Sequence, residues 1–201
     1  MPRVLTATDL ADFREKLIAA ATEMFAAKGR EAFTMREVAA ALGVSAMTPY
    51  RYFKDKDEIL AAVRAHAFNR FADALESAFE RPGDVRERSA AVGQAYVNFA
   101  FSEPASYRLM FDMAQPDEAN YPELVRATER ARQTMTDHVR ALVLAGALEG
   151  DPVLIGHVLW ASLHGAVVLK LAGKLGPECD FDRIVSGAFA ALWEGFRPGK
   201  G

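Results

Sequence analysis

Cysteine is nearly absent from the chain, and this scarcity excludes several kinds of site. Cys179 is the only cysteine among 201 residues. One thiol cannot build a disulfide framework or a cysteine-based zinc site within the chain, so we expect a reducing compartment, the cytoplasm. Cys179 falls in an expected turn with no second thiol to resolve an oxidised form, which disfavours a redox role.

An apolar leader is also absent from the first residues. The segment MPRVLTATDLADFREK carries charges throughout and has no apolar centre, unlike a secretory signal. The longest apolar run, residues 153–169, contains two histidines, a serine and several small residues. It therefore favours a buried or interfacial helix over a membrane span, and we expect no membrane partner.

Catalytic and metal-binding motifs are missing. The chain has no G-x-S-x-G, no H-E-x-x-H, no glycine-rich phosphate loop and no paired E-x-x-H. We expect neither an enzyme nor a cofactor; a helical-bundle enzyme or cofactor-binding protein without DNA binding is the alternative function. His157 and His164 share one face of an expected helix but lack a third ligand, so no metal is expected. His66 and His138 are lone histidines with expected structural or exposed roles.

What the sequence does contain is helical periodicity nearly throughout. No stretch alternates apolar and polar residues between hairpin turns, so the prediction is an all-α protein of about nine helices. Capping residues and glycines set the expected limits. The helices are expected at residues 8–28, 34–42, 55–81, 84–101, 104–111, 120–147 and 181–196, with two more that open at Ser45 and Asp151.

The two short helices after residue 34 indicate a helix-turn-helix. They are joined by Gly43, Val44 and Ser45, a tight turn with glycine. The second helix of such a motif lies in the major groove of DNA. Residues 28–56 contain six basic and three acidic side chains, a net charge of +3, whereas the whole chain carries −3. A local basic patch on an acidic chain predicts contact with phosphate.

The segment MTPYRYFKDKDE places a proline inside the second helix of this motif. Pro49 is the fourth residue after the expected cap Ser45, so its missing N–H would have bonded only the carbonyl of the cap. We expect a stiffened helix. Tyr50 and Tyr52 cannot both face one core, so at least one is exposed, and Phe53 is expected to pack inward. An exposed tyrosine suits DNA, with a flat body for sugars or thymine methyls and a hydroxyl for phosphate.

Residues 14–63, REKLIAAATEMFAAKGREAFTMREVAAALGVSAMTPYRYFKDKDEILAAV, resemble the DNA-binding domain of the TetR/AcrR family of bacterial transcriptional regulators. Farther on, EPASYRLMF and LWASLHGAVVLKL are similar to a subgroup of that family with a Trp…His-Gly pattern. The resemblance implies phosphate contacts from some residues and base-edge or nearby contacts from others. The implied DNA-binding residues are Thr34, Arg36, Ser45, Ala46, Met47, Thr48, Tyr50, Arg51, Tyr52 and Lys56.

The resemblance also implies the domain organisation and the function. A helix-turn-helix domain at 8–54 would be joined by a linking helix, 55–81, to a ligand-binding and dimerisation domain at 82–197. The chain would be a repressor that binds a palindromic double-stranded DNA operator as a homodimer. An unknown, small and largely apolar effector would release it. A protein that uses the motif only as a scaffold is disfavoured by the basic patch.

Candidate residues for the effector pocket and the dimer interface follow from side-chain type. Aromatic, sulfur-containing and polar-tipped side chains are core residues by default, and some can line a cavity. The pocket candidates are Tyr96, Phe99, Tyr107, Met110, Phe111, Met113, Trp160 and His164. The last two helices are rich in small residues, and the first of them is apolar nearly all round, so a two-fold partner is expected there. The interface candidates are Gly156, Ala161, Gly165, Gly187, Ala188 and Ala191.

Overall fold

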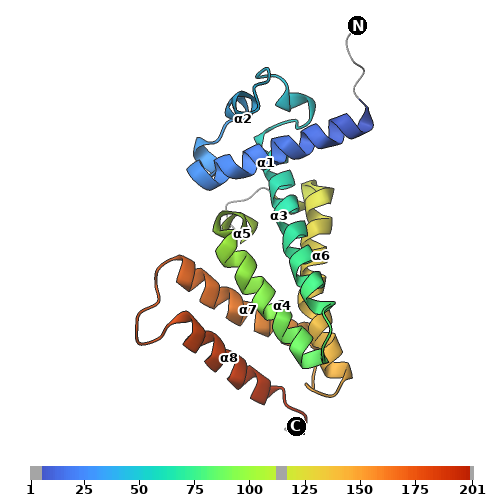
Figure 1. Ribbon diagram of the computed structural model, residues 1–201, viewed down its shortest axis with the longest axis vertical. Helices are drawn as coiled ribbons and strands as arrows, with labels where there is room; N and C mark the ends of the chain where they lie inside the picture. The colour runs from blue at the N-terminus through green and yellow to red at the C-terminus, as the bar shows by residue number, and fades with distance from the viewer. Residues whose placement is uncertain (1–5, 112–116, 200–201) are drawn as a thin grey trace. The chain divides into compact units, whose positions relative to one another are not determined.

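The computed structural model describes residues 6–111 and 117–199, and every regular element within them is helical, which confirms the all-α prediction (Figure 1). The elements are α1 (Ala7–Ala32), α2 (Met35–Ala41), the 3₁₀-helix η1 (Pro49–Arg51), α3 (Lys56–Phe79), α4 (Val85–Ser102), α5 (Pro104–Phe111), the 3₁₀-helix η2 (Glu118–Asn120), α6 (Pro122–Leu144), α7 (Pro152–Leu171) and α8 (Phe181–Gly195).

Local capping explains where several of these helices begin. The Thr34 hydroxyl accepts a hydrogen bond from the backbone N–H of Glu37, and the Glu37 carboxylate accepts one from the N–H of Thr34, a capping box that opens α2. Asp151 caps α7 with a single hydrogen bond, which its carboxylate accepts from the backbone N–H of Val153 at 2.9 Å, and Pro152 occupies the first helical position. In α1 the expected stop at Gly29 is a kink, since Gly29 has a φ of 73° and one further turn follows.

The helix expected to open at Ser45 is not a regular α-helix, and that prediction was wrong in detail. Residues 46–48 form turns, and η1 covers only Pro49–Arg51. The backbone N–H of Thr48 bonds the Ser45 carbonyl at 2.8 Å, one residue earlier than in an α-helix. Pro49 cannot donate to that carbonyl, so the chain tightens to 3₁₀-type bonds rather than continuing as an α-helix.

The described residues divide into two compact units. The first contains residues 6–69, 105–111 and 117–128, and the second contains residues 70–104 and 129–199. The predicted domain limits, 8–54 and 82–197, were drawn from motifs along the sequence. The segment after residue 104 packs with the first unit, a feature that sequence order does not reveal.

The first unit is held by a core that joins α1, α2 and the start of α3. Leu17, Ile18, Phe33 and Phe53 are almost completely buried in it. Phe25 and Phe33 stack with ring centroids 4.2 Å apart. The burial of Phe53 confirms that this side chain packs inward, and it anchors the segment after η1 to the core.

The second unit consists of the rest of α3 and α6 with α4, α7 and α8. Tyr96 and Phe99 on α4 each meet the Phe71 ring edge-to-face. Arg130 on α6 pairs with Asp73 at 2.6 Å and with Glu76, which ties α6 to α3. Gly156 is buried where α7 crosses α6: a Cβ there would lie 3.0 Å from the Met135 carbonyl oxygen. Close packing of α7 on α6 therefore explains why position 156 is a glycine.

Helix α7 is the one helix in the described ranges that is long and apolar enough to span a membrane by length and composition. Most of its apolar window is not buried within the chain. Val153, Leu154, Val168 and Leu169 are exposed apolar side chains on it. These features also fit a helix that another protein chain covers.

Candidate nucleic-acid interface and internal cavity

A glycine turn sets the geometry of the helix-turn-helix segment. Gly43 has a φ of 65°, a backbone conformation that favours glycine, and it follows Leu42, the residue that caps the end of α2. The N–H of Val44 then bonds the Ala39 carbonyl at 3.0 Å, which closes the end of α2. Met35, Val38 and Ala39 bury the inner face of α2, so Arg36 remains on its exposed face.

The segment after the turn is fixed from within by Pro49 and Phe53. Pro49 is buried, and its carbonyl accepts hydrogen bonds from the N–H groups of Tyr52 and Phe53, both at 3.0 Å. The side chains of Met47 and Tyr50, by contrast, are 67% and 45% exposed. A large apolar side chain and an aromatic one are thus held outward on a rigid local scaffold, as a recognition surface requires.

Most of the ten predicted DNA-binding residues are exposed. Thr34, Arg36, Ser45, Ala46, Met47, Tyr50 and Arg51 are exposed, whereas Thr48, Tyr52 and Lys56 are half-buried. The half-buried members have contacts of their own: the Tyr52 ring lies 5.3 Å from that of Phe13, and the Lys56 ammonium lies 5.8 Å from the Phe33 ring centre. The surface that the structure brings together is therefore centred on the segment around Met47 and Tyr50.

Local charges around this surface are only partly paired. Lys28 forms an ion pair with Glu37 at 2.6 Å. The hydrogen bonds that the Glu37 carboxylate accepts from Lys28 and from Thr34 lower its pKa. Arg36, Arg51 and Lys54 are exposed. Since Lys28 offsets the one acidic side chain of α2, these three exposed cations remain available near the surface beside the exposed Asp55.

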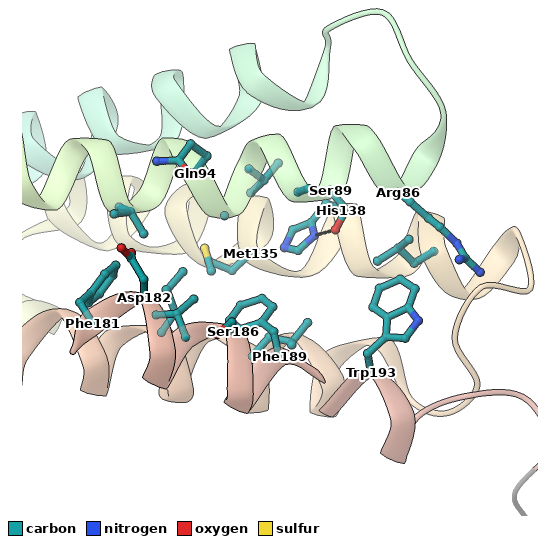
Figure 2. Close-up of a pocket in the computed structure, with 18 residues that line it drawn as sticks. Arg86, Ser89, Gln94, Met135, His138, Phe181, Asp182, Ser186, Phe189 and Trp193 are labelled. Carbon is teal, nitrogen blue, oxygen red and sulfur yellow. Dashed lines mark hydrogen bonds between the residues drawn. The ribbon is translucent and has the colours of Figure 1, made fainter. Parts of the chain in front are cut away.

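A cavity of about 550 Å³ that is partly open to solvent lies in the second unit, lined by α4, α6, α7 and α8. Figure 2 shows side chains of α8 facing those of α4 and α6 across it. Its lining is mainly apolar and includes Val92, Met135, Leu142, Leu163 and Phe189. Such a size and lining are typical of sites for drug-sized ligands, which occupy about 300–1,000 Å³.

None of the described residues predicted for the effector pocket lines this cavity. On α4 and α7, the Trp160 indole N–H donates to the Tyr96 hydroxyl at 3.1 Å, and that hydroxyl lies 3.2 Å from His164 Nδ1. Burial lowers the pKa of His164. With Phe99, these residues form a packed aromatic and polar cluster in the second unit.

The other pocket candidates lie in the first unit or outside the described residues. Tyr107 and Met110 are buried, and the rings of Tyr107 and Phe111 are 5.0 Å apart. The buried Arg64 donates to the Met110 carbonyl at 3.3 Å and pairs with Glu118 at 2.5 Å. Met113 falls outside the described residues.

The sequence held only a faint signal for the cavity. Ser89, Gly93 and Val97 recur every four residues on α4 and so share one face, and all three line the cavity. A face of small residues is equally compatible with close helix packing. Only the positions of α6 and α8 show that space is left there.

His138 is the most deeply buried polar side chain in the cavity lining. It is 7% exposed, and its Nδ1 lies 2.8 Å from the Ser89 hydroxyl oxygen. Figure 2 shows its imidazole between Met135 and Ser89. Burial lowers the pKa of His138 to about 4, so the ring is neutral at pH 7.

Comparison with known proteins agrees with this arrangement. The sequence model of the tetracyclin repressor-like C-terminal domain matches residues 89–192, and that of the tetR family of bacterial regulatory proteins matches residues 17–63. The HTH-type transcriptional activator FasR of Mycolicibacterium smegmatis is 29% identical over 130 residues, 65% of this chain and 58% of FasR. The HTH-type transcriptional regulator BetI of Rhizobium meliloti is 28% identical over 139 residues, 68% of each chain.

Solved structures share the fold over nearly the whole chain. A protein of unknown function from Rhodococcus sp. RHA1 superposes with a TM-score of 0.80 and 28% identity, covering 98% of each chain. A TetR family transcription regulator from Marinobacter aquaeolei VT8 has a TM-score of 0.70 at 20% identity, covering 95% of this chain and 98% of its own. Because the C-terminal match alone spans more than half of the 201 residues, the chain belongs to the tetR family of bacterial regulatory proteins, whose named relatives are transcriptional regulators and not enzymes.

Proposed function

We propose that this protein is a ligand-responsive transcriptional repressor that binds a palindromic operator as a homodimer in the cytoplasm. The observation that carries the proposal is the rigid, outward-facing segment with Met47 and Tyr50 exposed after a glycine turn. Exposed apolar and aromatic side chains on a helix-turn-helix have few uses other than contact with a macromolecule. DNA is the partner that the three exposed cations nearby favour.

The chemistry of this surface suggests how an operator is read. Ala46 and Met47 offer no hydrogen-bonding side chain, so they are suited to apolar contact with thymine methyl groups. Arg36 and Arg51 are the candidates for hydrogen bonds to guanine or to phosphate. We expect Thr34, Ser45, Thr48, Tyr50, Tyr52 and Lys56 to contact the DNA backbone or nearby base edges.

The proposed dimer forms through α7 and α8, which pack side by side. Leu154, Ala161 and Val168 recur every seven residues on α7 and are all exposed, so they form a stripe on one face. On α8, Gly187 and Ala191 are also exposed, one helical turn apart. Gly165 and Ala188 are half-buried. Packing of this face on its two-fold copy would remove apolar surface from water.

An effector in the cavity would control DNA binding by a population shift. Helix α3 is continuous, with residues 56–69 in the first unit and residues 70–79 in the second. In the repressing dimer the two recognition segments would lie about 34–36 Å apart, one turn of DNA. An effector that binds more tightly to a second arrangement of the dimer, one that does not fit the operator, shifts the population towards it. Operator affinity then falls by the ratio of the effector's affinities for the two arrangements.

Fluorescence anisotropy on the duplex upstream of the protein's own gene tests the proposal. We expect tight, salt-sensitive binding there, weaker binding to random duplex, and a loss of at least about tenfold in Tyr50→Ala. Leu144→Ala is the control, because Leu144 is exposed on α6, outside the helix-turn-helix.

The same assay has an outcome that would sink the proposal. If the upstream duplex fails, selection from a random duplex pool follows, and no enrichment of a palindrome would overturn operator binding. A promoter reporter is needed to distinguish repression from activation, since the relative FasR is named an activator. Higher reporter output with the protein than without it would replace repression by activation.

A further inference from the structure

His138 combines deep burial with an unused hydrogen-bonding atom. It lies in the lining of the cavity of about 550 Å³, and its Nδ1 is occupied by Ser89. No hydrogen bond in the described residues involves its Nε2, and this atom is not one of the fully buried side-chain nitrogens that lack a partner. Because the side chain is otherwise almost fully buried, Nε2 is left to face the cavity.

The contact between the Ser89 hydroxyl and His138 Nδ1 fits two tautomers of the neutral ring, because a hydroxyl can donate or accept a hydrogen bond. In one of these tautomers the Ser89 hydroxyl donates to His138 Nδ1, and no backbone carbonyl of the described residues competes for that hydrogen as one does at Ser102 and Ser162. A neutral imidazole that accepts at Nδ1 carries its hydrogen on Nε2. In this tautomer His138 presents an N–H donor to the cavity.

The charged groups of the lining favour an uncharged occupant. Arg86 and Asp182 are exposed and lie at opposite ends of the row of lining residues, with His138 between them (Figure 2). The Arg86 guanidinium already lies 5.2 Å from the Trp193 ring centre. No other charged side chain belongs to the lining among the described residues, so an ion held against the apolar walls beside His138 would lose part of its hydration without a charged partner.

We propose that the effector is an uncharged, mainly apolar molecule with a carbonyl-type acceptor that takes a hydrogen bond from His138 Nε2, and that Ser89 positions this donor. The proposal extends the ligand-binding function proposed above and rests on it. The acceptor group would distinguish the effector from plain hydrocarbons, which the apolar walls alone would bind. A buried donor left unpaired by a hydrocarbon is costly, so the site selects for the acceptor.

Probe binding without DNA tests this inference separately from operator binding. The probe is 6-propionyl-2-(dimethylamino)naphthalene, an uncharged ketone whose emission shifts to the blue in apolar surroundings. We expect saturable binding with a blue shift. Gly93→Phe should abolish it, because Gly93 lines the cavity and a Cβ there meets no atom within 4 Å. No saturable binding to the wild type, or equal binding to Gly93→Phe, overturns the inference.

Competition by fluorenone and fluorene isolates the carbonyl group. In wild type the affinity ratio of fluorenone to fluorene should exceed that in His138→Leu by about 3- to 10-fold, the value of one net hydrogen bond. His138→Gln keeps a donor and should retain most of the difference. His157→Leu, on α7 with its Nδ1 on the Val153 carbonyl, is the matched control and should match wild type.

Two results would refute the role of His138. One is an equal affinity ratio in wild type and His138→Leu, with both proteins folded by circular dichroism. The other is a ¹⁵N spectrum of the wild-type imidazole that shows the hydrogen on Nδ1 rather than Nε2. If the ratio behaves as expected and the anisotropy assay and duplex selection find no operator, the cavity assignment stands and the proposed regulatory function fails instead.

Discussion

The burial of His138 makes the free energy of unfolding depend on pH. The folded pKa of about 4 lies below the ordinary value of 6.5, so the unfolded chain binds a proton more readily. The stabilisation is complete above about pH 6.5 and declines as the pH falls towards 4. Between pH 7 and pH 5 we expect a loss of about 2 kcal/mol in the free energy of unfolding.

Urea unfolding at these two pH values measures that loss, and His138→Gln should remove most of it. His164 also has a lowered pKa, so a smaller slope remains in the variant. His66→Gln is the matched control, because the His66 side chain is 41% exposed. Equal pH slopes in wild type and His138→Gln would show that His138 is not held neutral.

Single residues also mark the limit of what the sequence revealed. The inward side of Phe53 and the caps at Thr34 and Asp151 were predicted correctly, because each depends on neighbours within four residues. His138 was expected to be merely structural or exposed. Its burial and its bond to Ser89 join positions 49 residues apart, and no local pattern encodes such a contact.

At the scale of elements, Gly156 sets how closely α7 approaches α6. A Cβ at this position would meet the Met135 carbonyl oxygen at 3.0 Å, and neither the backbone oxygen nor a Cβ fixed to its own Cα can turn away, so the helices themselves must shift. Gly156→Ala gains about 1 kcal/mol of helix propensity, but the crowding costs more. We expect a net destabilisation of about 1–2 kcal/mol by urea unfolding.

Gly93→Ala is the matched comparison on α4. Gly93 is also within a helix, but its Cβ would enter open space, so we expect a gain of about 1 kcal/mol from propensity alone. If both variants were stabilised equally, close contact between α6 and α7 would not be the reason for glycine at position 156.

Elements also differed in how well periodicity predicted them. The long helices were identified because apolar spacing and caps agree over several turns. The segment from Ser45 was predicted as an α-helix, and Pro49 converted it to 3₁₀-type turns, since one missing donor decides the hydrogen bonding of so short a segment. The cavity was missed because it is the space between four helices, which only their packing determines.

At the scale of the whole molecule, the basic segment is proposed to bind DNA and the exposed apolar face of α7 to form the dimer. The chain has a net charge of −3, yet residues 28–56 carry +3, so the acidic remainder repels DNA while this window attracts it. The basic segment 28–56 of a single chain binds DNA weakly by itself. In a dimer the two basic segments bind as one unit, because once the first segment is on the DNA the second contact becomes intramolecular.

The exposed stripe of α7 is therefore expected to govern operator affinity from outside the DNA-binding segment. Leu154 is 56% exposed and shares its face with Ala161 and Val168. In Leu154→Glu, dimerisation would bury an unpaired carboxylate, so we expect monomers in analytical ultracentrifugation. Operator affinity should fall by about 100-fold, since each monomer then binds a single half-site.

The matched control for this prediction is Leu144→Glu. Leu144 is 82% exposed at the end of α6, so it adds the same charge to a surface that the proposed interface does not include. It should remain dimeric with nearly unchanged operator affinity. A dimeric Leu154→Glu protein would exclude this face of α7 as the interface, and a monomeric one with wild-type operator affinity would break the link between dimerisation and DNA binding. Since α7 also lines the cavity through Leu159 and Leu163, dimer formation and effector binding act on the same helix, and the strength of one is expected to depend on the other.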